Sequence, residues 1–283
     1  MSTETIKIGD LPSSFMEDVL IRAFSDYSVA LGRVKNNESP EFTQLGTGVL
    51  VQKANRFGIL TAGHCLHACS PEVRLGREQG DKLFLIIQRG RIVFFEPQEL
   101  LEHRLVTPQC EEYGPDLTFI EILAIERLAT VKASGSFWSL DRNATEIIAA
   151  FGGIGTPLAS VGYPEADYAT RREGDTMIRT FRHMSYLNVI QAGNVFERDG
   201  WDYLESTIDY TDSVGLPDSF KGVSGGPVWG MHLRRNKDDG KIGIGKSALI
   251  GVTFYQTDTQ HNKRRLRAHF IRSIYETAWK TRD

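Results

Sequence analysis

The sequence predicts an all-β fold made of two antiparallel barrels, with a short helix near each end of the chain. Short apolar runs alternate with turn residues along most of its length, and this even spacing is typical of small antiparallel barrels. A less regular stretch at residues 126–153 separates the runs into two groups, which we interpret as two barrels joined by a crossover. The chain has 283 residues, 41% of them hydrophobic, so it can bury a substantial core.

The first group of strands is expected to follow a helix. Residues 12–24 combine serines with apolar residues at helical spacing, which predicts that helix. The alternating runs then predict strands at residues 28–34, 46–52, 56–61, 82–88, 91–95 and 117–122, with one helical turn at 64–69.

The second group follows the crossover, in which residues 143–151 are expected to be helical. Strands are expected at residues 158–164, 177–187, 201–207, 227–231 and 247–255. Residues 234–245 are polar and contain glycines, so we expect a mobile hairpin loop there. Residues 267–279 carry apolar residues at helical spacing and predict a C-terminal helix. The basic run 263–267 is interpreted as the solvated start of that helix, with a binding patch as the alternative.

These elements divide the chain into a series of parts. We expect an N-terminal extension with a short helix at residues 1–26, a first barrel at 27–130, a crossover at 131–157, a second barrel at 158–265 and a C-terminal helix at 266–283. The candidate functional residues described below fall in both barrels, His64 and Asp116 in the first and Ser224 in the second.

Charge and composition argue against some classes of partner. Lys and Arg number 33 against 36 Asp and Glu, so the net charge of -3 gives little electrostatic support for nucleic-acid binding. No segment has the apolar length of a membrane span, and residues 1–10 mix acids with apolar residues, unlike a secretory signal. The cysteines Cys65, Cys69 and Cys110 form no regular disulfide framework. We therefore expect a cytoplasmic protein that binds neither nucleic acid nor membrane.

The segment Gly222-Val223-Ser224-Gly225-Gly226-Pro227 is the strongest candidate for a catalytic site. A serine between glycines can sit on a tight turn with its hydroxyl exposed. The amides of Gly222 and Ser224 then point into one small space, where they would form an oxyanion hole. Glycine and serine also make ordinary turns, which is the alternative for this segment.

Two upstream residues supply the partners that such a nucleophile needs. His64 follows the apolar run 58–61 at a small-residue turn, and Asp116 follows Gly114-Pro115 just before an alternating strand. Each has a structural alternative, a buried histidine and a turn or strand-start cap. In the order His64, Asp116, Ser224 they provide a general base, a carboxylate that fixes its tautomer, and a nucleophile.

Four segments together resemble the trypsin/chymotrypsin-like serine proteases. They are Gly46-Thr47-Gly48-Val49-Leu50-Val51, Thr61-Ala62-Gly63-His64-Cys65, Asp116-Leu117-Thr118-Phe119-Ile120 and Gly222-Val223-Ser224-Gly225-Gly226-Pro227, and they follow the order and spacing of that family across about residues 25–275. The resemblance implies six strands in each barrel and a hydrolase that cleaves protein or peptide substrates through an acyl-enzyme. It implies no metal and no organic cofactor.

The resemblance also places a substrate-binding region. Asp218, six residues before Ser224, stands where trypsin has the acid that binds a basic side chain, so a preference for Arg or Lys is implied. A turn residue that faces water is the alternative for Asp218. The strand 251–256, with Thr253, Phe254, Tyr255 and Gln256, is expected to line the cleft and to pair with an extended substrate, and Gln256 to narrow the pocket mouth.

One departure from the family pattern bears on regulation. Val223 stands where zymogen-type relatives have an aspartate, so the chain is more similar to bacterial and viral trypsin-like or HtrA-like proteases, without a PDZ domain. This motivates the hypothesis of a regulatory protein partner.

The cysteines also differ from those of secreted relatives, since no cysteine lies near Gly46 to pair with Cys65. The cluster His64, Cys65, His67, Cys69 fits no standard zinc spacing and would consume the proposed base.

Two other functions are compatible with the same residues. A pseudoprotease would use the double barrel to bind peptides or proteins without cleaving them. An esterase would use the same catalytic residues on a different acyl group.

Overall fold

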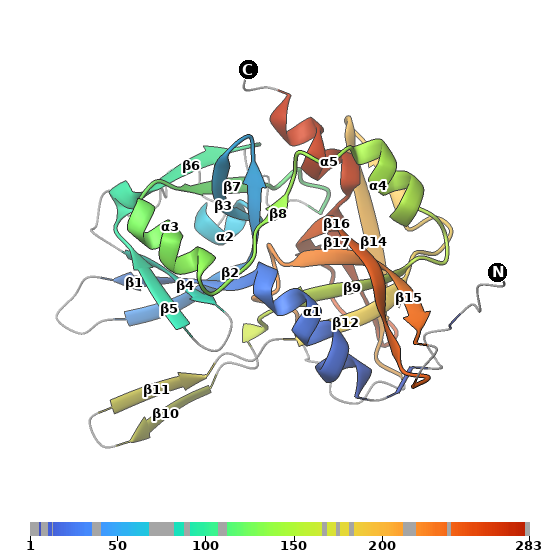
Figure 1. The fold of residues 1–283 in the computed structure, drawn as a ribbon, viewed down its shortest axis with the longest axis horizontal. Helices are drawn as coiled ribbons and strands as arrows, with labels where there is room; N and C mark the ends of the chain where they lie inside the picture. The colour runs from blue at the N-terminus through green and yellow to red at the C-terminus, as the bar shows by residue number, and fades with distance from the viewer. Residues whose placement is uncertain are drawn as a thin grey trace.

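The computed structural model describes residues 6, 11–12, 14–35, 41–67, 82–87, 91–106, 112–165, 169–173, 176–180, 184–211, 219–236 and 239–280. The fold is mostly β, with two large antiparallel sheets that lie next to each other and few helices (Figure 1). In that part of the chain no helix is both long and apolar enough to cross a membrane.

The first sheet is built from the N-terminal half of the chain. Its strands are β1 (Ser28–Lys35), β2 (Glu41–Lys53), β3 (Arg56–Thr61), β4 (Lys82–Ile87), β5 (Arg91–Phe95), β6 (Leu100–Arg104), β7 (Thr118–Ile122) and β8 (Trp138–Ser139). The order across the sheet is β5-β4-β1-β2-β3-β7-β6, with all neighbours antiparallel. The short β8 joins β2 in parallel.

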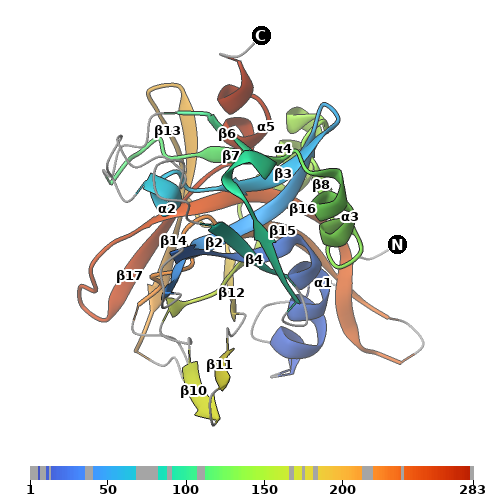
Figure 2. The same cartoon turned by 90° about the vertical axis from the view of Figure 1, so that its left-hand side faces the viewer.

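The second sheet comes from the C-terminal half. Its strands are β9 (Pro157–Gly162), β12 (Met184–Val189), β13 (Val195–Arg198), β14 (Trp201–Asp209), β15 (Pro227–Arg235), β16 (Ile242–Gln256) and β17 (Lys263–His269). They are antiparallel in the order β12-β9-β15-β16-β17-β14-β13. Among the described strands, β10 (Ala169–Glu173) and β11 (Thr176–Thr180) pair with each other alone, and this hairpin projects from the body of the molecule (Figures 1 and 2).

The helices are short, and they lie near the ends of the chain or in the segments that connect the strands. They are a π-helix (Met16–Ile21), α1 (Arg22–Phe24), α2 (His64–His67), α3 (Ile125–Lys132), α4 (Ala144–Phe151) and α5 (Ile271–Tyr275), with single 3-10 turns at Ser25–Tyr27, Pro97–Glu99 and Thr277–Trp279. The helix α4 begins where Asn143 accepts a hydrogen bond from the Thr145 amide at 2.9 Å, which is ordinary N-cap chemistry.

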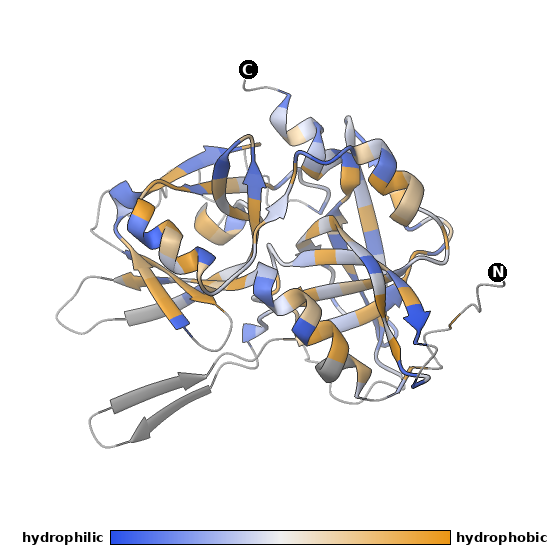
Figure 3. Ribbon diagram, viewed as in Figure 1, coloured by the Kyte–Doolittle hydropathy of each residue, from blue (hydrophilic) through white to orange (hydrophobic). Residues whose placement is uncertain are grey.

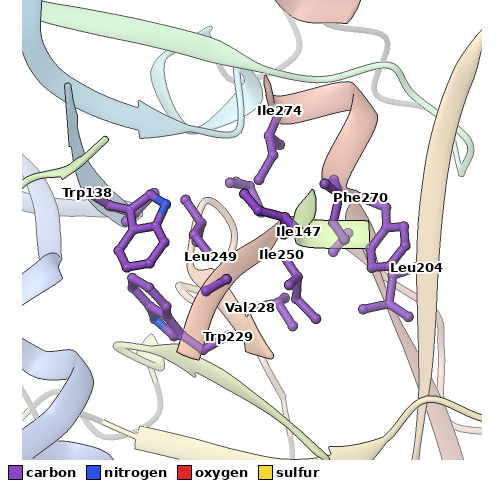
Figure 4. Close-up of a cluster of buried hydrophobic side chains, with 14 of the residues drawn as sticks. Trp138, Ile147, Leu204, Val228, Trp229, Leu249, Ile250, Phe270 and Ile274 are labelled. Atoms are coloured by element: carbon purple, nitrogen blue, oxygen red, sulfur yellow. The ribbon is translucent and has the colours of Figure 1, made fainter. Parts of the chain in front are cut away.

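One hydrophobic core joins the two sheets. Trp229 of β15 is fully buried, stacks on Phe24 at 4.8 Å between ring centroids, and meets Trp138 edge-on at 5.2 Å (Figure 4). Hydrophobic residues recur along the strands of both sheets (Figure 3). The Trp138 indole donates to the Tyr275 hydroxyl at 2.7 Å, which donates in turn to Leu249 O at 2.8 Å. The N-terminal helix and the C-terminal helix are therefore parts of the core that holds the sheets together.

Several sequence predictions are corrected by this fold. Within the described residues the sheets contain eight and seven strands rather than six each, and residues 177–187 are divided between β11 and β12. The expected loop at 234–245 is largely a β-hairpin, because Leu233 pairs with Ile244 and Arg235 with Ile242. The strands β6, β10 and β13 and the helix α3 were not predicted, since their sequences lack a long alternating or helical pattern.

The basic run 263–267 is a strand and not the start of a helix. It forms β17 in the middle of the second sheet, where Lys263 lies opposite Asp209 and Arg267 opposite Glu205. Lys263 Nζ lies 3.3 Å from Asp209 Oδ2, and Arg267 Nη2 lies 2.5 Å from Glu205 Oε2. Acidic partners on β14 thus stabilise the run as a strand, and the C-terminal helix begins only at Ile271.

Candidate active site

His64 and Asp116 meet where strand β3 ends and its neighbour β7 begins in the first sheet. The ring of His64, the first residue of α2, donates from Nδ1 to Asp116 Oδ2 in a short hydrogen bond, and the backbone amide of His64 donates to Oδ1 at 3.0 Å. Asp116 is 1% exposed, whereas the His64 side chain is 28% exposed. Because a carboxylate only accepts, Nδ1 donates the proton of this bond, and Nε2 is the ring nitrogen that Asp116 does not use.

Ser224 lies beside this pair through its backbone. Its carbonyl accepts from the Thr47 amide at 2.8 Å and from the thiol of Cys65, the residue after His64, at 3.4 Å. Within the described part of the chain the Ser224 hydroxyl makes no hydrogen bond to the His64 ring. His64 and Asp116 are therefore hydrogen-bonded to each other. Ser224 lies next to them, but its hydroxyl is not hydrogen-bonded to the His64 ring.

The turn that carries Ser224 fits only because glycines flank it. Gly225 has φ +84°, and a Cβ there would lie 2.0 Å from both Thr47 O and Thr61 Oγ1. Gly222 has φ +89°, and a Cβ there would lie 2.6 Å from Tyr163 O. Both positions combine a left-handed backbone with a close backbone approach, so a larger residue would displace the turn.

The peptide groups of this turn are oriented by hydrogen bonds to their carbonyls. Lys221 O accepts from the Glu165 amide at 2.7 Å, and Val223 O accepts from the Gly226 amide at 2.8 Å. In a trans peptide the N–H points away from the preceding C=O, so the amides of Gly222 and Ser224 point away from these partners. Neither amide donates to another described residue. Two free amides two residues apart on one turn can stabilise a negatively charged oxygen.

Thr47 links the first sheet to the nucleophile turn. Its side chain is fully buried, and its hydroxyl donates to Gly222 O at 2.7 Å while accepting from the Tyr163 amide at 3.0 Å. In the sequence, Thr47 stands out only as part of a glycine-containing segment. Its position on β2 between two glycines is the signal that could have identified it, since a small hydroxyl side chain there can reach a neighbouring turn.

The strand expected to bind substrate is mostly packed inward. Thr253 lies behind the turn, where its carbonyl accepts from the Gly225 amide at 2.6 Å and its amide donates to Gly226 O at 2.9 Å. Phe254 is 3% exposed and stacks on His269 at 4.6 Å. Neither side chain is free to contact a substrate in this arrangement.

The next two residues of that strand have different surroundings. Tyr255 is half-buried and lines an open cavity of about 730 Å³ together with Glu112, Arg265 and others. Gln256 is bound to the loop before the nucleophile, because its Oε1 accepts from the Phe220 amide at 2.9 Å and from Arg264 at 3.1 Å. Asp218, the residue from which basic specificity was predicted, lies outside the described residues.

Cys65 is a buried free thiol beside the site. Burial, and to a lesser extent the charge of Asp116, raises its pKa to about 12, so the thiol stays protonated and can donate to Ser224 O. Of the zinc alternative, the His67 side chain and Cys69 lie outside the described residues. Among the residues that are described, no group of three His, Cys, Asp or Glu side chains is placed to hold a metal.

His269 is a site residue that the sequence analysis did not identify. It ends β17, is fully buried, and accepts a hydrogen bond at Nε2 from the Asp116 amide at 3.0 Å. Burial lowers its pKa to about 4, although the nearby Asp116 carboxylate acts in the opposite direction. The residue was assigned to a helix from its neighbours, so no local signal pointed to this contact.

The low pKa of His269 predicts a loss of stability in mild acid. Because its pKa falls from an ordinary 6.5 to about 4 on folding, only the unfolded chain binds this proton between those pH values. We expect His269 to lower the free energy of unfolding by up to roughly 3 kcal/mol as the pH falls through this window. Urea unfolding at about pH 7, 5.5 and 4 checks this against His269→Gln, which should show a shallower decline. If the free energy of unfolding declined equally in the two proteins, the pH dependence would come from groups other than His269.

The site thus places a histidine–aspartate pair, a serine and two free amides where the two sheets meet. A comparison with known protein families and with curated proteins finds no match to this chain.

Proposed function

We propose that this chain is a serine endopeptidase of the trypsin/chymotrypsin-like kind, with the two sheets as its two barrels. In this proposal His64, Asp116 and Ser224 form the catalytic triad, and the amides of Gly222 and Ser224 form the oxyanion hole. The observation that carries it is the His64–Asp116 pair beside the turn of Ser224, a turn held by Thr47 and Cys65. The reaction needs no metal and no organic cofactor.

The proposed reaction is acyl transfer. The Ser224 oxygen attacks the carbonyl carbon of a peptide bond while its proton passes to His64 Nε2, and Asp116 stabilises the imidazolium that forms. The oxyanion accepts from the two free amides, each worth about 3 kcal/mol in comparable sites. His64 then gives the proton to the leaving amine as the C–N bond breaks. Water, deprotonated by His64, attacks the acyl-enzyme, and Ser224 leaves with that proton.

An extended peptide is the substrate that the sheet edge favours. Beyond Val252 the strand β16 is no longer paired with β15, and among the described residues only β17 pairs with Tyr255 and Gln256. Thr253 on this edge is bound to Gly225 and Gly226, so a substrate segment would pair beyond it, at Tyr255 and Gln256, as an additional antiparallel strand. Cleavage after Arg or Lys stays a prediction from Asp218.

Labelling with a fluorophosphonate probe tests the proposal. We expect the purified protein to react at Ser224, as located by mass spectrometry, and the Ser224→Ala variant to give no adduct. A matched control is Ser219→Ala, which removes a hydroxyl on the same loop and should leave labelling intact. Adduct formation at another serine, or equal labelling of the Ser224→Ala protein, would contradict the proposal. Comparing peptide and ester substrates then separates a peptidase from an esterase.

A latent or inactive peptide-binding module is the second candidate. The observation that favours it is the absence of a hydrogen bond between Ser224 and His64 in the described structure. Catalytic hydrogen bonds of this kind often tighten only when substrate binds, so the endopeptidase is the better-supported proposal. Well-folded protein that resists the probe would favour the module. Labelling that appears only when a cell extract is added would favour an enzyme controlled by a regulatory protein partner.

A further inference from the structure

We propose that His269 is a positioning residue for Asp116. It holds the backbone of Asp116 so that the Asp116 carboxylate meets His64. The inference rests on the proposed roles of His64, Asp116 and Ser224. It adds a buried group from the second sheet to a pair that belongs to the first sheet.

The backbone of Asp116 needs an outside partner. Asp116 precedes β7, in a segment without regular structure, so no neighbouring strand receives its amide. The residue is 1% exposed, and its amide donates to His269 Nε2 at 3.0 Å. A buried amide without an acceptor is strongly unfavourable, so this hydrogen bond favours one backbone position.

The two sides of Asp116 are thus attached to different residues. Both carboxylate oxygens accept from His64, one from the ring and one from the amide, and the backbone amide donates to His269. If Asp116 could rotate or shift, the His64 ring would move with it, because the ring is hydrogen-bonded to Oδ2. His269 therefore acts on catalysis through Asp116 and not by contact with substrate.

The ring of His269 is itself held in place. It stacks on Phe254 at 4.6 Å with an interplanar angle of 28°, tilts against Tyr203 at 5.4 Å and meets Trp201 edge-on at 5.3 Å. Its backbone is paired within the sheet with Tyr203 on β14 and Val252 on β16. The ring is packed on several sides, so its Nε2 is a rigid acceptor.

The neutral form of His269 suits this role, although it leaves the N–H at Nδ1 without a partner. An acceptor at Nε2 requires the neutral ring with its proton on Nδ1, and burial favours the neutral ring by lowering its pKa to about 4. Nδ1 is buried and has no hydrogen-bond partner among the described residues. A folded protein seldom leaves a buried N–H unpaired, and the bond to the Asp116 amide gives a reason to retain histidine here.

Two substitutions separate the acceptor from the packing. His269→Phe keeps a flat ring against Phe254 but removes the acceptor, whereas His269→Gln can place an amide oxygen near the position of Nε2. We expect His269→Phe to lower kcat on a peptide substrate by about 10- to 100-fold with little change in KM, because the base is displaced by a fraction of an ångström. We expect His269→Gln to restore most of kcat.

Proton NMR gives a readout that does not need activity. The short bond from His64 Nδ1 to Asp116 should give a low-field proton resonance in the wild-type protein, retained in His269→Gln and shifted or broadened in His269→Phe. The apparent pKa in the kcat/KM profile should fall in His269→Phe, because a displaced carboxylate stabilises the imidazolium less.

The outcomes distinguish this inference from the proposed function. A folded His269→Phe protein with wild-type kcat and an unchanged resonance would overturn it. If that variant does not fold, a folded His269→Gln protein that has lost kcat and the resonance would also overturn it, and one that retains them would support it. A wild-type protein without any peptidase activity, both alone and with cell extract added, would overturn the proposed function. The dependence of the resonance on the acceptor would still decide the role of His269.

Discussion

Replacing Asp116 by asparagine is expected to lower kcat by about 10⁴-fold without unfolding the protein. Asp116 accepts from both the ring and the amide of His64. An asparagine offers one oxygen and one NH₂ group, so it can hold the ring with Nδ1 as an acceptor and the proton on Nε2. In that tautomer His64 cannot take the proton of Ser224. Steady-state kinetics on a peptide substrate, with circular dichroism as the check on folding, measures the effect.

Asp202→Asn is the matched control for this substitution. Both carboxylate oxygens of Asp202, like those of Asp116, accept hydrogen bonds. Their donors are the backbone amides of Arg272 at 2.9 Å and Ser273 at 2.6 Å, where α5 begins. Its loss should lower the free energy of unfolding by about 1 kcal/mol and leave kcat unchanged. If Asp116→Asn reduced kcat no more than Asp202→Asn does, Asp116 would be a structural acid and the proposed triad would be wrong.

Replacing Gly225 by alanine is expected to destabilise the protein by about 3 to 5 kcal/mol. The backbone at Gly225 has φ +84°, and the new Cβ would lie 2.0 Å from Thr47 O and Thr61 Oγ1. The turn must therefore move away from β2 and β3, which would also displace Ser224. Urea unfolding monitored by tryptophan fluorescence measures the change, and fluorophosphonate labelling of the variant should be lost at the same time.

Gly193→Ala separates the two causes of this effect. Gly193 has nearly the same backbone angle, φ +82°, but a Cβ there would have no neighbour within 4 Å. It should cost only about 1 kcal/mol, the penalty of a left-handed backbone. A similar loss in both variants would mean that the close approach to Thr47 and Thr61 is relieved easily and does not hold the turn.

The sequence alone predicts the local elements of this fold well. The strands β3 and β5 begin and end where the alternation of apolar residues predicts, and α4 starts after its Asn143 cap. These elements depend on residues two to four positions apart, which a pattern along the chain contains. The same kind of local pattern singled out His64, Asp116 and the glycine-flanked Ser224 as candidates.

The tertiary structure decided what depends on residues far apart in the chain. The basic run 263–267 is interpreted from the sequence as a helix start because it precedes a segment with helical spacing, yet its acidic partners on β14 place it in a sheet. The bond between His269 and Asp116 spans 153 positions, and Thr47 reaches Gly222 across 175. Whether a buried polar group is satisfied depends on which groups the folded chain brings within about 3 Å. Sequence periodicity carries no such information, so the groups around the candidate acid and nucleophile could be identified only in the folded protein.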